Sequence, residues 1–163
     1  TVDAVYRLLE VPRGQSIADL EAEICALVPD GETALRSILA VVREAGSDAE
    51  NTRAHGLEGF LARTRDQRVG VIDGYCGYFL TAAGTPRKDI ITKDVKTAMP
   101  QAEDIVRHEA NRLADIHKRM SALRLAEGTG ALLTVAADML GRYEDTKRAR
   151  DALDFDDLIL RTG

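Results

Sequence analysis

The chain has 163 residues, of which 45% are hydrophobic and 30% are charged, and its net charge is −5. This length suits one domain with a hydrophobic core and is too short for two ordinary domains. The acidic balance excludes a protein coated in positive charge, so any contact with nucleic acid must come from a local basic patch.

The N-terminal part of the chain predicts three short amphipathic helices. The first is expected over Val2 to Val11, before the helix-breaking "PRG". Ser16 caps the second, with Asp19 three positions later standing in for the usual Glu of a capping box. The "PDGE" at 29–32 predicts a turn, and a third helix is expected to end near Gly46.

The middle of the chain is less regular. Two helical stretches are expected within residues 47–82, although several glycines from Gly56 to Gly77 weaken the helix propensity there. Residues 81–100 contain Gly84 and two prolines and predict a loop with one helical turn. Both cysteines fall in apolar helical stretches, so buried free thiols and a reducing compartment are expected; they are Cys25 and Cys76.

The C-terminal part predicts long helices. One should begin after Pro100, which suits the first turn of a helix, and another should run from about residue 131 to 150. The "GTG" at 128–130 either breaks or kinks the chain between them. No segment alternates as a strand would, so the sequence predicts an all-α fold with about six to eight helices.

These helices are predicted to form one helical domain over residues 1–163. Residues 1–50 would supply the N-terminal helices, residues 51–100 helices and a basic loop, and residues 101–163 the long helices that end in "LDFDDL". No stretch approaches 18 uninterrupted apolar residues, so we expect no membrane contact and a cytoplasmic location.

Sequence motifs identify no catalytic residue. The G-x-x-x-x-G-K-[ST] and G-x-S-x-G patterns are both missing from the sequence. In "HEANR", Arg112 occupies the position where a zinc-protease helix needs its second His. His108 and His117 are nine residues apart and point to different sides of a helix. We therefore assign no metal ligand and no cofactor to these residues.

Three aspartates in the C-terminal "LDFDDLIL" leave three interpretations open. Asp154 lies where a helix N-cap would, with Asp156 and Asp157 in the first turn, where carboxylates are stabilised by free backbone N–H groups. A metal or catalytic cluster would need more oxygen ligands than three adjacent side chains can aim at one point. The third interpretation is that this helix is the edge of a larger protein.

The other candidate site is the loop from Thr85 to Thr97, which carries four cations against two aspartates, a net charge of +2. The cations are Arg87, Lys88, Lys93 and Lys96. One interpretation is a solvated loop whose lysines stabilise neighbouring helix ends. The other is a contact with a nucleic-acid backbone, which needs only a few well-placed cations and hydroxyls.

Several stretches together resemble one protein family. The tail "YEDTKRARDALDFDDLILRT" resembles superfamily 1 DNA helicases of the UvrD/RecB type. Upstream, "YFLTAAGTPRKDIITKDV", then Glu109 and Arg112, then "GALLTVAADMLGRYEDTK", are similar to the AddA subunit of bacterial AddAB helicase–nucleases. The resemblance covers roughly residues 55 to 163.

This resemblance implies that the chain is an excised 1B-like helical subdomain of a parent helicase. The parent would be an ATP-dependent 3'-5' DNA helicase/exonuclease of double-strand break repair and recombination, using ATP and Mg²⁺. Its Walker A, Walker B and nuclease motifs would lie elsewhere, so this chain is expected to be inactive alone. Expected partners are DNA (duplex or fork), the remaining motor and nuclease domains, and an AddB-like subunit.

Two sets of residues match family segments. Asp154, Phe155, Asp156, Asp157 and Leu158 match the junction between insert and motor, and the cationic loop matches a "PRK…TK" segment that would contact DNA. Two alternatives from other classes remain: a protein–protein interaction module without DNA contact, and a carboxylate enzyme built on the aspartates.

Overall fold

The computed structural model describes residues 1–27 and 29–149, and this part of the chain is all-helical, as predicted. Its elements are α1 (Val2–Leu8), α2 (Ile17–Cys25), α3 (Pro29–Ala45), α4 (Asp48–Leu61), the 3-10 helix η1 (Arg65–Val71), α5 (Ile72–Phe79), α6 (Lys93–Ala98) and α7 (Ala102–Ala149). Within the described residues, β-type pairing is limited to one isolated bridge between Leu80 and Pro86. None of the described helices combines the length and apolar character needed to cross a membrane.

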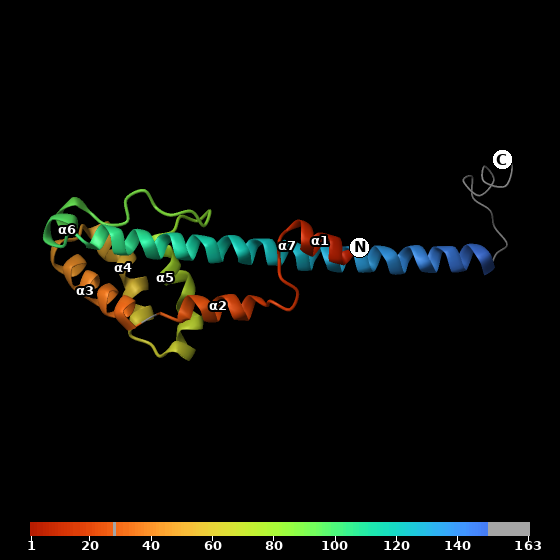
Figure 1. The fold of residues 1–163 in the computed structure, drawn as a ribbon, viewed down its shortest axis with the longest axis horizontal. Helices are drawn as coiled ribbons and strands as arrows, with labels where there is room; N and C mark the ends of the chain where they lie inside the picture. The colour runs from red at the N-terminus through yellow and green to blue at the C-terminus, as the bar shows by residue number, and fades with distance from the viewer. Residues whose placement is uncertain (28, 150–163) are drawn as a thin grey trace.

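Helix α7 runs the length of the described structure, and most of the other helices pack against it (Figure 1). Its 48 residues make it about 72 Å long at the usual rise per residue. Helices α2 to α5 gather along its first half, and α1 lies against its middle (Figure 1). The first half therefore carries a buried apolar stripe at helical spacing, namely Val106, Leu113, Ile116, Met120 and Leu123. Residues 131–143, by contrast, are all exposed.

The core is centred on aromatic side chains from α4 and α5. The rings of Phe60 and Tyr75 stack with their centroids 3.8 Å apart, and Phe79 meets Tyr75 edge-on at 5.2 Å. The two helices can approach this closely because Gly56 faces Gly74: a Cβ built on Gly56 would lie 2.0 Å from the Gly74 carbonyl oxygen. Two of the glycines that weakened the helix prediction, Gly56 and Gly74, thus form the close contact between these helices.

Two arginines, the buried Arg68 and the half-buried Arg112, secure the C-terminal end of α2, where the last carbonyl groups have no partner within the helix. Arg68 donates to the carbonyl oxygens of Cys25 and Phe60 at 3.3 and 3.2 Å, and it pairs with Glu32 at 2.9 Å. Arg112 donates to two more α2 carbonyls at 3.0 and 3.4 Å. The backbone of α2 is therefore fixed to η1 and α7, and Arg68 extends this link to α3 and α4.

Local signals predicted some boundaries and missed others. The capping box of Ser16 and Asp19 is confirmed, with backbone and side-chain hydrogen bonds in both directions. The turn expected at "PDGE" is wrong, because α3 already begins at Pro29, and a proline is well tolerated in a first helical turn. The "GTG" segment does not break α7, which runs through it. Helix α1 ends at Leu8, since Glu10 adopts a left-handed φ of 54°.

Candidate nucleic-acid interface

The candidate site is the basic segment, defined here as residues 80–98: the loop after α5, together with α6. It begins with a tight turn in which the Thr81 amide donates to the Thr85 carbonyl at 2.8 Å and the Gly84 amide donates to the Thr81 carbonyl at 2.9 Å. Gly84 has a φ of +76° and packs on the His117 ring of α7, where a Cβ would lie 2.0 Å from a ring carbon. The turn therefore requires glycine at position 84 and packs directly against α7.

Arginines from two helices hold the rest of the loop by its backbone. Arg107 of α7 donates to the carbonyl oxygens of Arg87 and Lys88 at 2.8 and 2.9 Å. Arg53 of α4 donates to the Ile90 carbonyl at 3.3 Å, and the Ile90 side chain is buried in the core. Because Arg107 and Arg53 bind these backbone carbonyls, the loop is fixed in place while its own charged side chains remain available to a ligand.

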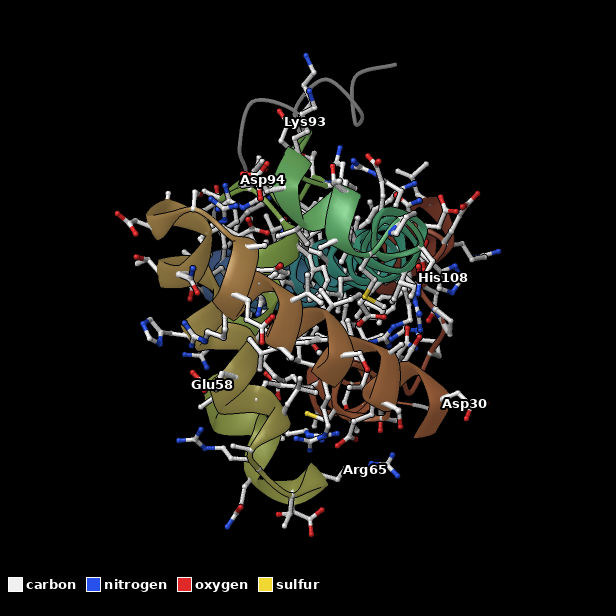
Figure 2. All side chains as sticks on the ribbon, turned by 90° about the vertical axis from the view of Figure 1, so that its left-hand side faces the viewer. Asp30, Glu58, Arg65, Lys93, Asp94 and His108 are labelled. Atoms are coloured by element: carbon white, nitrogen blue, oxygen red, sulfur yellow. The ribbon has the colours of Figure 1, made fainter. Side chains whose placement is uncertain are left out.

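The four cations proposed for this site differ in their surroundings. Arg87 donates through Nε to the Gly77 carbonyl at 3.1 Å, and its other guanidinium nitrogens have no partner among the described residues. Lys88 and Lys93 are exposed, and neither has an ion-pair partner in the described part of the chain. Lys93 extends outward from α6, beside Asp94 (Figure 2). Lys96 instead pairs with Glu103 at 2.8 Å, so its ammonium already has an anionic partner within the chain.

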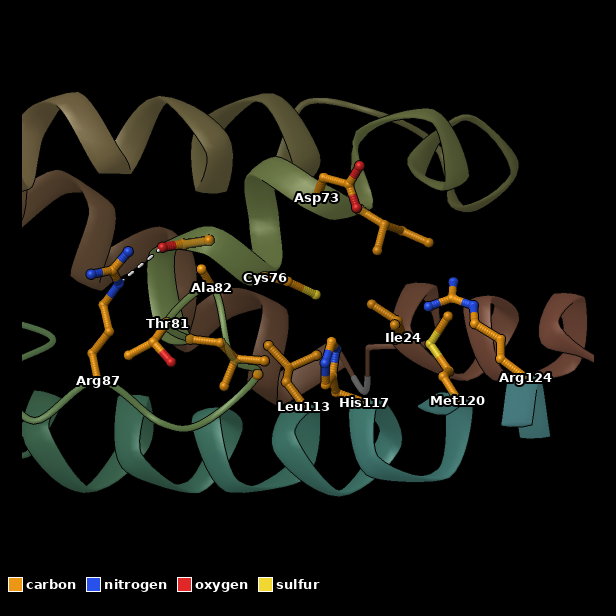
Figure 3. Close-up of a pocket in the computed structure, with 14 residues that line it drawn as sticks. Ile24, Asp73, Cys76, Thr81, Ala82, Arg87, Leu113, His117, Met120 and Arg124 are labelled. Carbon is orange, nitrogen blue, oxygen red and sulfur yellow. Dashed lines mark hydrogen bonds between the residues drawn. The ribbon is translucent and has the colours of Figure 1, made fainter. Parts of the chain in front are cut away.

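A cavity of about 410 Å³ lies beside the basic segment, between α5 and α7 (Figure 3). Its walls are largely apolar and include Leu113 and Met120. Arg87 lines one end and Arg124 the other; Arg124 is exposed and makes no ion pair or hydrogen bond with any described residue. The cavity thus has a cation at each end and the carboxylate of Asp73 in its wall.

Sequence reasoning missed Arg53, Arg107 and Arg124. Arg53 and Arg107 act on carbonyl groups 37 and 20 residues away in the chain, and no local pattern announces such contacts. Arg124 lines the cavity between α5 and α7, and this cavity exists only once the two helices have packed together. The "HEANR" residues gain a structural role instead: Arg112 and the Tyr75 hydroxyl both donate to the Glu109 carboxylate, at 2.6 Å each.

The cavity also contains the thiol of Cys76. Both cysteines are free, as predicted, but only Cys25 is fully buried and Cys76 is half-buried. Burial, and next the carboxylates of Asp73 and Glu109, raises the pKa of Cys76 to about 11, from an ordinary value of 9.0. A thiol with such a pKa stays neutral near pH 7 and is a weak nucleophile. The cavity is therefore better suited to binding than to covalent catalysis.

The raised pKa of Cys76 predicts a loss of stability at alkaline pH. The folded state holds the proton more tightly than the unfolded state, so this contribution is intact below about pH 9 and is lost as the pH rises towards 11. Between pH 8 and pH 10.5, the wild type should lose about 2 kcal/mol relative to Cys76→Ala, as measured by urea unfolding. The contribution of Cys25 is the same in both proteins and cancels. If the free energy of unfolding changes with pH by the same amount in the wild type and in Cys76→Ala, the prediction is contradicted.

The C-terminal candidates, Asp154, Phe155, Asp156, Asp157 and Leu158, lie outside the described residues, so their three interpretations stay as the sequence left them.

Compared with known proteins, the chain matches no protein-family model, no curated protein and no solved structure. The candidate interface rests on the geometry of the basic segment and on the sequence resemblance.

Proposed function

We propose that this chain is the DNA-engaging, 1B-like helical subdomain of an ATP-dependent helicase–nuclease subunit of the AddA type, acting in double-strand break repair. One observation carries the proposal: Arg53 and Arg107 hold the backbone of the basic segment, while Lys88 and Lys93 stay exposed and have no ion-pair partner within residues 1–27 and 29–149. The sequence resemblance supplies the family. ATP and Mg²⁺ would belong to motor domains outside these residues, and the location would be cytoplasmic.

The physical basis of the contact would be phosphate neutralisation. A few cations on a rigid backbone can bind phosphates with little loss of entropy, because the loop is ordered before DNA arrives. The basic segment has no aromatic residue, so base stacking of the kind used by single-strand-binding proteins is not available to it. With a net charge of −5, the chain should bind weakly and only through this local patch.

The test is fluorescence anisotropy of the chain on labelled duplex, forked and single-stranded DNA over a series of salt concentrations. Lys88→Ala and Lys93→Ala should each weaken binding and reduce the log–log salt slope on duplex by about 0.9, the value for one lost phosphate contact. Lys96→Ala is the matched control on the same helix as Lys93: its ammonium is paired with Glu103, so the slope should stay unchanged.

Circular dichroism must show each variant folded. If the folded chain fails to bind at low salt, or if Lys93→Ala and Lys96→Ala change the slope equally, the basic segment is not the DNA contact. In the parent enzyme, neutralising Arg87, Lys88, Lys93 and Lys96 together should reduce unwinding. Unchanged unwinding would favour the second candidate function.

That second candidate is a protein-interaction module, and the far half of α7 favours it. Residues 128–137 include no charged side chain, although residues 131–137 are exposed. The exposed apolar side chains along this half are Leu132, Leu133, Val135, Met139, Leu140 and Tyr143, and Leu132 is 69% exposed. Exposed apolar side chains gathered in this way are typical of interaction sites, which supports this candidate. The two functions are compatible, because the basic segment lies beside the first half of α7 and this surface is on the second half.

A further inference from the structure

A group of buried polar atoms lies beneath the basic segment, where the protein offers them no hydrogen-bond partner. Among the described residues, four buried side-chain atoms are in this position: Glu50 Oε1, Arg53 Nε, Tyr78 OH and Thr92 Oγ1. Glu50 and Tyr78 are 0% exposed as whole residues. Buried polar groups in folded proteins are almost always paired with protein or with ordered water, so these atoms call for an explanation.

The four residues, named here the polar cluster, come from α4, α5 and the end of the loop. The Thr92 amide donates to Glu50 Oε2 at 3.2 Å, and Arg53, one turn after Glu50, reaches the Ile90 carbonyl two residues before Thr92. Burial raises the pKa of Tyr78; the nearby Glu50 raises it further, and Arg53 opposes this. The unpaired atoms thus belong to neighbouring side chains: Glu50 contacts Thr92, and Tyr78 lies within electrostatic reach of Glu50 and Arg53.

The chemistry of the polar cluster limits what could bind there. Glu50 supplies an acceptor, Arg53 a donor, and Tyr78 and Thr92 a hydroxyl each that can play either part. The Arg53 charge disfavours a cation and the Glu50 charge disfavours an anion. A water molecule has two donors and two acceptors, and buried waters usually make about three hydrogen bonds to such groups.

We propose that Glu50, Arg53, Tyr78 and Thr92 enclose ordered water that ties the start of α6 to α4 and α5. Thr92 is the N-cap residue of α6, yet its side chain makes no capping hydrogen bond, which leaves the hydroxyl free for this contact. The next residue is Lys93, so the water would set where the exposed cation of the basic segment begins. Glu50, Arg53 and Tyr78 would then be positioning residues for that segment.

The first test is the sign of one stability change. If the Tyr78 hydroxyl binds water shared with Glu50, Tyr78→Phe should raise the equilibrium constant of unfolding roughly fivefold and lower the Tm. If the hydroxyl is unpaired, the same substitution removes a desolvated polar group and should raise the Tm, which would overturn the proposal. Tyr6→Phe is the control: the Tyr6 side chain is half-buried and its hydroxyl is not among the buried unpaired atoms, so no change is expected.

A second measurement separates water from direct pairing. A crystal structure of the chain at a resolution that shows ordered solvent should contain a water within hydrogen-bond distance of Glu50 and Tyr78. A direct hydrogen bond between these two side chains, without water, would contradict the proposal. Hydrogen exchange at the Thr92 amide should be faster in Tyr78→Phe. None of these readouts involves DNA, so the inference can fail or hold independently of the proposed function.

Discussion

Gly56→Ala should lower the free energy of unfolding by about 3 kcal/mol, which would leave a domain of this size close to unfolding. The added methyl group would lie 2.0 Å from the carbonyl oxygen of Gly74 and 2.4 Å from its carbonyl carbon, so the obstacle is backbone and not a movable side chain. Helices α4 and α5 would have to separate, and the stack of Phe60 on Tyr75 beside the contact would open. Urea unfolding followed by circular dichroism measures the change.

Gly59→Ala is the matched control, since it lies on the same helix one turn later. Its Cβ would meet only the end of the Arg63 side chain at 3.3 Å, and a flexible side chain can move aside. Alanine is a better helix former than glycine, so this variant should gain up to about 1 kcal/mol. Equal losses at Gly56 and Gly59 would show that helix propensity, and not the close approach of α4 and α5, determines the effect.

These glycines also explain why the sequence predicted α4 and α5 poorly. Propensity treats glycine as a weakness within a helix, whereas here Gly56 and Gly74 allow a close helix contact that recovers the cost through packing. The same reasoning applies to "GTG" in α7, where a Cβ on Gly130 would lie 3.1 Å from Val2 of α1. A long helix already packed on its neighbours can tolerate two glycines. In both cases the helix is determined by contacts between residues far apart in the chain, which a short stretch of sequence does not reveal.

Where the relevant physics is local, the sequence was sufficient. The Ser16 and Asp19 box depends on atoms three residues apart, and the single helical turn of α6 lies between the loop breakers that predicted it. The basic segment was found from its charge alone. Its internal order was not predictable, because the pairing of Lys96 with Glu103 and the support from Arg107 depend on how α6 meets α7.

Arg112→Ala should be at least as damaging as Gly56→Ala, with a loss of about 3–5 kcal/mol, the range for breaking one partner of a buried ion pair. Arg112 donates to both oxygens of Glu109, at 2.8 Å from Nε and 2.6 Å from a terminal nitrogen, and Glu109 is 7% exposed. The variant would leave that carboxylate buried with only the Tyr75 hydroxyl to stabilise it. It would also leave carbonyls at the end of α2 without a donor.

The Tyr75 hydroxyl cannot replace the lost cation. Burial, and next the charge of Glu109, raises the pKa of Tyr75 well above its ordinary value, so the phenol stays protonated and donates one hydrogen bond without supplying a positive charge. Glu109→Gln in the Arg112→Ala background should therefore recover part of the loss, because an amide costs less to bury than an unpaired carboxylate. No recovery in the double variant would mean that the α2 carbonyls, and not the charge, dominate.

Arg119→Ala provides the comparison that isolates burial. Arg119 lies two turns further along α7 and makes a two-pronged ion pair with Glu23 of α2, at 2.9 and 3.0 Å. This pair also joins α7 to α2, but both of its side chains are more than one-third exposed. Solvent screens such a pair, so its loss should cost less than about 1 kcal/mol in urea unfolding. Similar losses for Arg112→Ala and Arg119→Ala would mean that the link between α2 and α7 is carried by the apolar stripe, with the buried network contributing little.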